Sequence, residues 1–190
     1  MTSLATLLLE TGLLQFGRFH EQGVIKPYYL HLDLLPSYPD VLSQITEQAL
    51  PFVGKVDHIL SAADALPFGV SLSLKTQIPL VYARGTQAAT VHELAGAYDI
   101  GHPALLLANT LAPPLFDLAQ QAHVVGLETR TILVIVDEGL YSTSNILTKS
   151  LLTLPDMIPE LAEAGHLPAG QAQVVQRWIE ANRHPGLTAP

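Results

Sequence analysis

The hydrophobic positions change rhythm along the chain, and this change predicts the order of its first elements. From 4 to 11 the apolar residues recur on one helical face, and Gly12 follows in the position where helices stop. From 28 to 34 polar and apolar residues alternate, which is typical of a half-buried strand. After Pro39 the helical spacing returns and continues to Pro51. The first quarter therefore predicts a helix, a strand and a second helix.

The middle of the chain predicts a parallel sheet. Four short runs of nearly continuous apolar residues indicate strands that are covered on both faces. These runs are 56–60, 80–83, 104–108 and 132–136. Helical patterns lie between them, one around Phe68 and Leu72 and one from Leu115 to Val125 that Gly126 ends. Buried strands that alternate with helices predict an α/β fold with right-handed crossovers.

The last part of the chain predicts two helices, one that ends at Gly165 and one that follows Pro168 and carries Trp178 in an apolar stripe. Residues 184–190 are expected to be a frayed tail. A length of 190 residues fits one domain, which we place at 1–183.

Composition then narrows the classes of function. Nine Lys and Arg stand against 17 Asp and Glu, a net charge of −8, so no nucleic-acid or acidic-lipid partner is expected. Only 14% of the residues are charged, against about 25% in an average domain, which favours a buried interface between copies. The lack of cysteine, of a signal peptide and of an 18-residue apolar run predicts a cytoplasmic protein that neither spans a membrane nor has a zinc-thiolate site.

Few polar side chains suggest chemistry by their spacing. His31 and Asp33 would share one strand face and could form a His–carboxylate pair for acid–base work, or a simple surface hydrogen bond. The pair His92-Glu93 begins like a zinc-protease helix, but Gly96 stands where the second histidine should be, so no metal site is expected.

Positive charge is missing from the middle of the chain. Between Arg84 and Arg130 there is no Lys or Arg, although four acidic residues lie there. They are Glu93, Asp99, Asp117 and Glu128. A site for a polyphosphate needs several cations, so this segment argues against one.

Several segments together resemble the orotate phosphoribosyltransferase branch of the type I phosphoribosyltransferases. They are Leu14-Gln15-Phe16-Gly17-Arg18-Phe19, Lys26-Pro27-Tyr28-Tyr29, Ile78-Pro79-Leu80-Val81-Tyr82-Ala83-Arg84, Val134-Ile135-Val136-Asp137-Glu138-Gly139 and Leu151-Leu152-Thr153-Leu154. The resemblance implies an α/β phosphoribosyltransferase-like fold, with a five-stranded parallel sheet flanked by helices. It also implies a small N-terminal hood at about 1–36, a core at 37–150, C-terminal helices at 151–183 and a homodimer.

The same resemblance identifies where phosphoribosyl pyrophosphate would bind. In the family a strand ends in two acidic residues, and a Thr-Thr-Gly turn then holds the 5′-phosphate with backbone N–H groups. The matching stretch here is Ala108, Asn109, Thr110, Leu111, Ala112, Pro113 and Pro114. It lacks both acids, and the two prolines have no N–H to donate.

The remaining family positions also differ. Asp64 lies where the family has a glycine-rich pyrophosphate turn, and the loop from Gly85 to Glu93 has no lysine, so only His92 could replace that residue. Arg84 matches a pyrophosphate-contacting arginine. Lys26, Tyr28 and Tyr29 would form a base-binding pocket, or a solvated lysine beside packing aromatic rings. The residual cleft candidates are therefore Lys26, Tyr28, Tyr29, Asp64, Arg84 and His92.

We therefore expect an orotate phosphoribosyltransferase-like protein that has lost binding of phosphoribosyl pyrophosphate and transferase activity. It would persist as a small-ligand-binding or regulatory homodimer without a cofactor. Two alternatives stay open. One is an active pyrimidine phosphoribosyltransferase with a rewired site and a need for Mg²⁺. The other is a structural subunit that pairs with an active paralogue.

Overall fold

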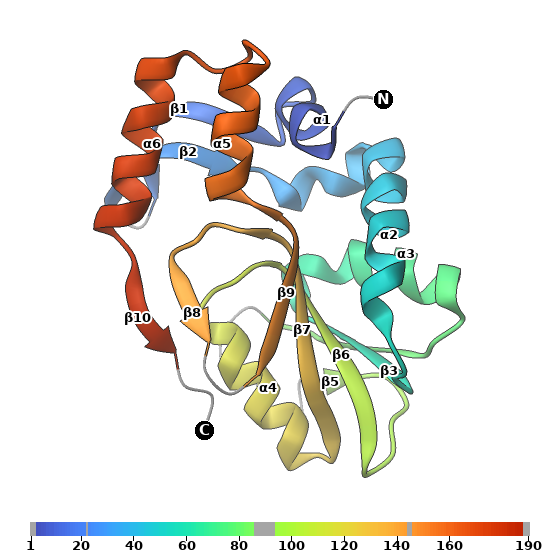
Figure 1. Ribbon diagram of the computed structural model, residues 1–190. Helices are drawn as coiled ribbons and strands as arrows, with labels where there is room; N and C mark the ends of the chain where they lie inside the picture. Colours follow the sequence, from blue (N-terminus) through green and yellow to red (C-terminus); the bar gives the residue numbers. More distant parts are fainter. Residues whose placement is uncertain (1–2, 22, 86–93, 144–145, 188–190) are drawn as a thin grey trace.

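The computed structural model describes residues 3–21, 23–85, 94–143 and 146–187, and a central sheet organises them (Figure 1). The sheet has six strands in the order β5-β4-β3-β6-β7-β9. Their bounds are β3 His58–Ser61, β4 Leu80–Ala83, β5 Leu94–Ala95, β6 His102–Thr110, β7 Leu127–Asp137 and β9 Leu147–Thr153. Five strands are parallel, as expected, and β5 adds an antiparallel edge to β4. A two-residue strand is too short to leave a periodic pattern in the sequence.

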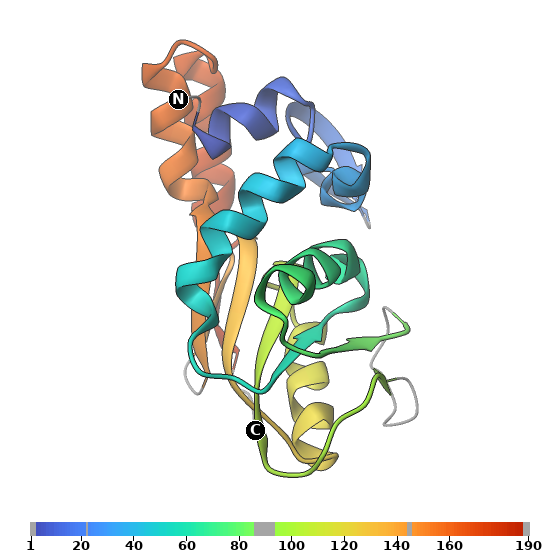
Figure 2. The ribbon, with the colours of Figure 1, turned by 90° about the vertical axis from the view of Figure 1, so that its right-hand side faces the viewer.

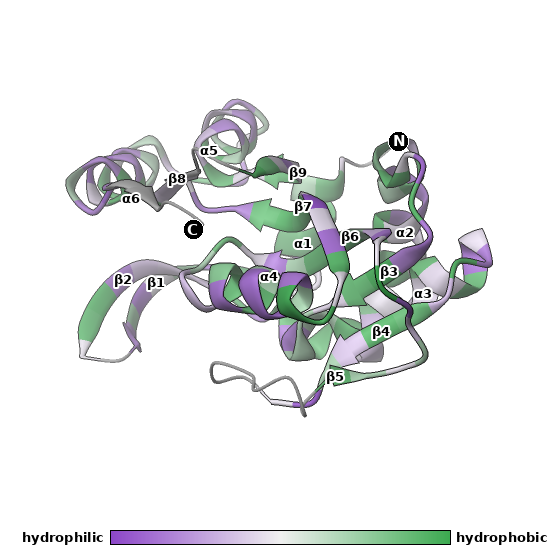
Figure 3. Ribbon diagram, turned by 90° about the horizontal axis from the view of Figure 1, so that it is seen from below, coloured by the Kyte–Doolittle hydropathy of each residue, from purple (hydrophilic) through white to green (hydrophobic). Residues whose placement is uncertain are grey.

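Helices cover both faces of the sheet. Successive residues of a strand point to opposite faces, so a strand of continuous apolar residues needs cover on both. In β6, Leu105 and Leu107 pack in one core with α2 (Pro39–Val53) and α3 (Leu66–Thr76). Leu106 and Ala108 pack in the other core with α4 (Pro114–Val124). Figure 2 shows α4 on the side of the sheet opposite α2. Figure 3, a view from below, shows hydrophobic colour on parts of the central strands and of the helices beside them.

The order of connections creates a switch point between β3 and β6. From β3 the chain passes through α3 to β4 on one side, whereas from β6 it passes through α4 to β7 on the other. β3 and β6 are neighbours, and their carboxyl ends lead into helices on opposite faces. In open α/β sheets, ligands bind in the crevice at such a point.

A hood lies at the carboxyl ends of the parallel strands (Figure 1). Its N-terminal part contains α1 (Leu4–Glu10), the hairpin of β1 (Leu14–Glu21) and β2 (Val24–Leu30), and a 3₁₀ helix, η1 (Leu32–Ser37). The C-terminal helices α5 (Leu154–Glu163) and α6 (Ala169–Ala181) pack against it, α5 on α1 and α6 on β2. Both ends of the chain therefore build this part of the molecule.

Three local expectations differ from the structure. The strand predicted at 28–34 ends at Leu30, because the chain then turns into η1, whose Leu32 and Leu35 are buried one 3₁₀ turn apart. The helix α2 continues past Pro51 to Val53 and ends at Gly54, where φ is +66°. Residues 184–187, expected to be a tail, form β10 (His184–Leu187) and pair with β8 (Tyr141–Thr143). Within the described ranges, no helix is long and apolar enough to cross a membrane.

Candidate functional site

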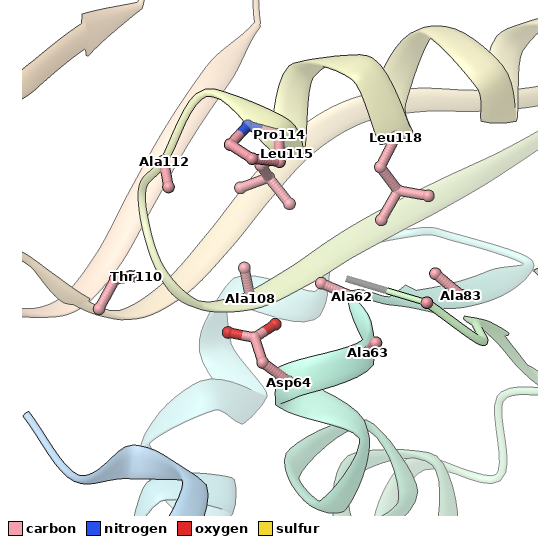
Figure 4. A pocket seen from close by; sticks show the side chains of 11 residues that line it. Ala62, Ala63, Asp64, Ala83, Ala108, Thr110, Ala112, Pro114, Leu115 and Leu118 are labelled. Atoms are coloured by element: carbon pink, nitrogen blue, oxygen red, sulfur yellow. The ribbon is translucent and has the colours of Figure 1, made fainter. Parts of the chain in front are cut away.

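A cleft of about 240 Å³ lies at the switch point (Figure 4). Three segments form its walls: the turn after β3, the end of β4, and the loop between β6 and α4 with the first turns of that helix. The lining residues are Ala62, Ala63, Asp64, Ala83, Gly85, Ala108, Thr110, Ala112, Pro114, Leu115 and Leu118. Most of these side chains are methyl or isobutyl groups, so the cleft is largely apolar.

Hydrogen bonds hold the turn after β3 against the end of β6. The N–H of Ala62 donates to the Leu107 carbonyl at 2.9 Å, and Nδ2 of Asn109 donates to the Asp64 carbonyl at 2.9 Å. Asn109 is only 6% exposed, so its amide is used within the structure. The short 3₁₀ helix η2 (Ala63–Ala65) then leads into α3. These bonds fix the side of the cleft from which Asp64 extends.

The amino end of α4 forms the facing wall. Its backbone N–H groups are either absent or already hydrogen-bonded within the chain. Pro113 and Pro114 have no N–H. The N–H of Leu115 donates to the Ala112 carbonyl and that of Phe116 to the Pro113 carbonyl, each at 3.0 Å. Within residues 113–116, which the structure describes in full, no N–H remains for a bound anion. This helix end therefore lacks the donors with which helices usually hold phosphate.

Asp64 supplies the one charged side chain among the residues that line the cleft. Figure 4 shows its carboxyl pointing towards Ala108, across from Pro114 and Leu115. Partial desolvation beside the cleft raises the pKa of this carboxyl above its usual value, although Asp64 as a residue is exposed to solvent and hydrogen bonds from the backbone of Asp64, Ala65 and Asn109 oppose the shift. The backbone N–H groups of this turn therefore already donate to the carboxylate of Asp64, a negative group of the chain itself.

Replacing Asp64 by asparagine is expected to raise the free energy of unfolding at neutral pH only slightly, because Asp64 is exposed to solvent and water screens its charge. Because the folded-state pKa lies above the ordinary value of 3.8, stability falls as the pH rises from 3.8 through the folded-state pKa. The amide has no charge to desolvate, and its oxygen still accepts hydrogen bonds. Urea unfolding at about pH 7 should show the gain, and the same measurement at about pH 3 should not. A variant that is less stable at both pH values would contradict this reasoning.

The other expected cleft residues lie elsewhere or outside the described residues. Arg84 directly follows β4 and is exposed, but it does not line the cleft. His92 and most of the loop from Gly85 to Glu93 fall outside the described residues. Tyr29 lies in the hairpin between the rings of Phe19 and His31, with centroid distances of 5.7 and 4.4 Å. The cleft therefore contains Asp64 and part of the segment 108–114 from the predicted set.

Lys26 and Tyr28 belong to a separate cluster that joins the hood to the end of β7. Nζ of Lys26 lies 2.8 Å from Oε2 of Glu21 and 3.1 Å from Oε1 of Glu138. The hydroxyl of Tyr28 donates to the same Glu138 oxygen at 2.7 Å, and its ring meets the edge of Trp178. Lys26 is therefore neither a solvated lysine nor a free cation for a ligand.

Burial and charge act in opposite directions on Lys26. Burial lowers its pKa, but the negative charges of Glu138 and Glu21 outweigh this effect and leave the pKa raised. Burial and the nearby Glu138 carboxylate both raise the pKa of Tyr28, which keeps its hydroxyl protonated as a donor. The ammonium also lies 5.2 Å from the Tyr28 ring centroid and 5.9 Å from that of Trp178. The hood is thus fixed to the core by a charged, largely buried contact.

His31 and Asp33 do not form the pair that the sequence predicted. His31 precedes η1 and its ring lies against that of Tyr29 at an interplanar angle of 50°, whereas Asp33 lies within the first turn of η1, so the two residues do not share a strand face. Sequence analysis also missed the part played by Glu138. Its place after the buried strand β7, at the carboxyl edge of the sheet, was the available signal.

Among the described residues that line the cleft, few side chains could contact a Mg²⁺–pyrophosphate group. Asp64 and the Thr110 hydroxyl are the polar side chains of the lining. In the part of the chain that is described, no three His, Cys, Asp or Glu residues come together as metal ligands. A carboxyl with a raised pKa, and no Lys or Arg among the described residues that line the cleft, offer a magnesium polyphosphate little to bind.

Comparisons with known proteins agree with the fold. No family model matches the chain. In sequence it is 23% identical over 187 residues to an orotate phosphoribosyltransferase of Sulfolobus acidocaldarius, covering 92% of this chain and 95% of that protein. In structure it superposes on the orotate phosphoribosyltransferase of Francisella tularensis with a TM-score of 0.71 and 14% identity, over 93% of this chain and 97% of that one.

A larger protein contains a similar domain. The Leishmania donovani UMP synthase superposes with a TM-score of 0.82 and 20% identity over 94% of this chain, which spans 42% of the length of that chain. The orotate phosphoribosyltransferase of Aeropyrum pernix gives a TM-score of 0.68 at 19% identity, over 84% of this chain and 99% of that one. The chain therefore has the type I phosphoribosyltransferase fold, and its sequence is similar to that of one orotate phosphoribosyltransferase at 23% identity.

Proposed function

We propose that this protein has lost the binding of phosphoribosyl pyrophosphate, and with it transferase activity, and that it binds a small ligand in the cleft instead. The amino end of α4 carries this proposal, because its prolines and internal hydrogen bonds leave it without anion donors. A protein that holds a sugar pyrophosphate needs such donors where this cleft has alkyl groups.

Charge supports the same proposal. Phosphoribosyl pyrophosphate is a polyanion, and the cleft presents it with the carboxyl of Asp64 and with no Lys or Arg among its lining residues. Asp117, in the first turn of α4, adds a second negative charge near the helix end. Lys26, which the resemblance places near the base, is bound to Glu21 and Glu138.

We further propose that the protein acts as a homodimer. A charged fraction of 14% leaves much of the surface uncharged. Large apolar side chains such as Leu74, Val124 and Ile100 are 70%, 69% and 86% exposed. An interface between copies would remove part of this apolar surface from water. A homodimer recovered from cells would also count against pairing with an active paralogue, whereas co-purification of a second chain would favour it.

An active phosphoribosyltransferase with a rewired site is the second candidate. Its support is Arg84, an exposed cation between the cleft-lining residues Ala83 and Gly85. In that case the protein would consume orotate in the presence of phosphoribosyl pyrophosphate and Mg²⁺, and Arg84→Ala would abolish the reaction.

Titration calorimetry with phosphoribosyl pyrophosphate and Mg²⁺ tests the principal proposal. We expect no heat of binding, because no Lys or Arg among the lining residues compensates for desolvating the phosphates. An active orotate phosphoribosyltransferase, titrated in the same buffer, serves as the positive control. Micromolar binding, or orotate consumption above the enzyme-free rate, would reverse the ranking of the two candidates.

A further inference from the structure

Building on the proposed function, we propose that the cleft takes a small apolar amine, with its ammonium group against Asp64 and its hydrocarbon part against the alkyl wall. A volume of about 240 Å³ lies just below the usual range for drug-sized ligands, about 300–1,000 Å³. The ligand must therefore be small. The following arguments identify its charge and the nature of its body.

The walls select an apolar body. On the side of β3 and β4 the lining consists of the alanine methyls of Ala62, Ala63 and Ala83 beside Gly85. On the side of α4 it consists of Ala112, Pro114, Leu115 and Leu118. Apart from Asp64, only Thr110 adds a polar side chain. A ligand with several polar groups would lose hydration here without finding partners, whereas a hydrocarbon body gains from leaving water.

The carboxyl of Asp64 selects a cation or a strong donor. It extends from a turn that hydrogen bonds fix against β6, and it faces the cavity (Figure 4). An ionised carboxylate has more acceptor positions than its backbone donors fill, and it only accepts hydrogen bonds. Among the lining residues no cation neutralises it. An ammonium group would supply the missing charge together with N–H donors.

Other ligand classes fit less well. An anion meets the carboxyl and a helix end without free N–H groups. A metal ion finds a lone carboxylate within alkyl walls, and no cluster of metal ligands exists among the described residues. A neutral hydrocarbon would fill the cavity but gain nothing from Asp64, whose charge would keep only water and its backbone donors as partners. The positive dipole end of α4 would oppose an ammonium, but Asp117 in its first turn offsets that charge.

Calorimetry with benzylamine and benzyl alcohol at neutral pH tests this inference. The two probes have the same ring and methylene, and they differ in carrying an ammonium or a hydroxyl. We expect benzylamine to bind at least about tenfold more tightly, as one charge-assisted hydrogen bond provides. Asp64→Asn should remove this difference without unfolding the protein. Glu163→Gln also removes one negative charge, but Glu163 is an exposed residue at the end of α5 that does not line the cleft, so this variant should preserve the difference.

Each outcome discriminates. Equal affinity for the two probes would overturn the amine assignment, as would a preference for benzylamine that survives in Asp64→Asn or disappears in Glu163→Gln. Absence of binding by both probes would overturn it too. The titration with phosphoribosyl pyrophosphate on the same sample shows separately whether the proposed function has failed, because only that ligand tests the lost anion site.

Discussion

Replacing Glu138 by alanine is expected to lower the free energy of unfolding by about 3 kcal/mol, because it removes one partner of a largely buried ion pair. The side chains of Glu138 and Lys26 are 11% and 17% exposed. Without Glu138, the Lys26 ammonium keeps only the more exposed Glu21, and the Tyr28 hydroxyl loses its acceptor inside the structure. Urea denaturation at neutral pH measures the loss.

Two matched variants separate charge from hydrogen bonding. Glu138→Gln retains an acceptor for Tyr28 but removes the charge, so it should lie between the parent protein and Glu138→Ala. Tyr28→Phe removes only a hydroxyl and should cost about 1 kcal/mol. If Glu138→Ala unfolds at the same urea concentration as the parent protein, the cluster does not hold the hood to the core.

The same cluster has a pH dependence with a defined sign. The pKa of Lys26 is raised above its ordinary value of 10.5, so the stability it contributes is complete below pH 10.5. This contribution is lost as the pH rises through the higher folded-state pKa. The difference in stability between the parent protein and Glu138→Ala should therefore shrink as the pH rises above 10.5.

The sheet could be predicted from the sequence because its signal is local. Each buried strand is a short apolar run, and Gly126 ends the helix before β7 at a φ of +89°. Elements without a local signal were missed or misplaced. The edge strand β5 has only two residues. Residues 184–187 form a strand through pairing with β8, more than forty positions earlier in the chain, which no window of sequence contains.

The candidate site likewise has some features that the local sequence predicts and others that depend on the tertiary structure. The prolines of α4 could be read as missing donors, because a backbone without N–H is a property of the residue itself. That the N–H groups of Leu115 and Phe116 are also used depends on the geometry of the turn. The partners of Lys26 lie 5 and 112 residues away, so its pairing with Glu138 follows from topology and not from spacing. Charge composition alone could not show that this lysine is unavailable.

Replacing Phe68 by alanine is expected to lower the free energy of unfolding by about 3–5 kcal/mol, because it creates a cavity in the core between α3 and the sheet. This loss equals or exceeds the one expected for Glu138→Ala. Phe68 is fully buried, two positions after the start of α3 and four after Asp64. The contact of α3 with β3 is close here: a Cβ at Gly69 would lie 2.8 Å from that of Ser61. Partial collapse of α3 into the cavity would therefore displace the turn that carries Asp64.

Two controls connect this loss to the cleft. Val70 lies on the same helix but is 41% exposed, so Val70→Ala should change stability by no more than about 0.5 kcal/mol. Phe68→Leu keeps most of the buried volume and should cost about 1–2 kcal/mol. If the turn depends on this packing, benzylamine affinity at a temperature where all variants remain folded should decrease in the order Val70→Ala, Phe68→Leu, Phe68→Ala. Equal affinity in all three would show that the hydrogen bonds to β6 position Asp64 without support from α3.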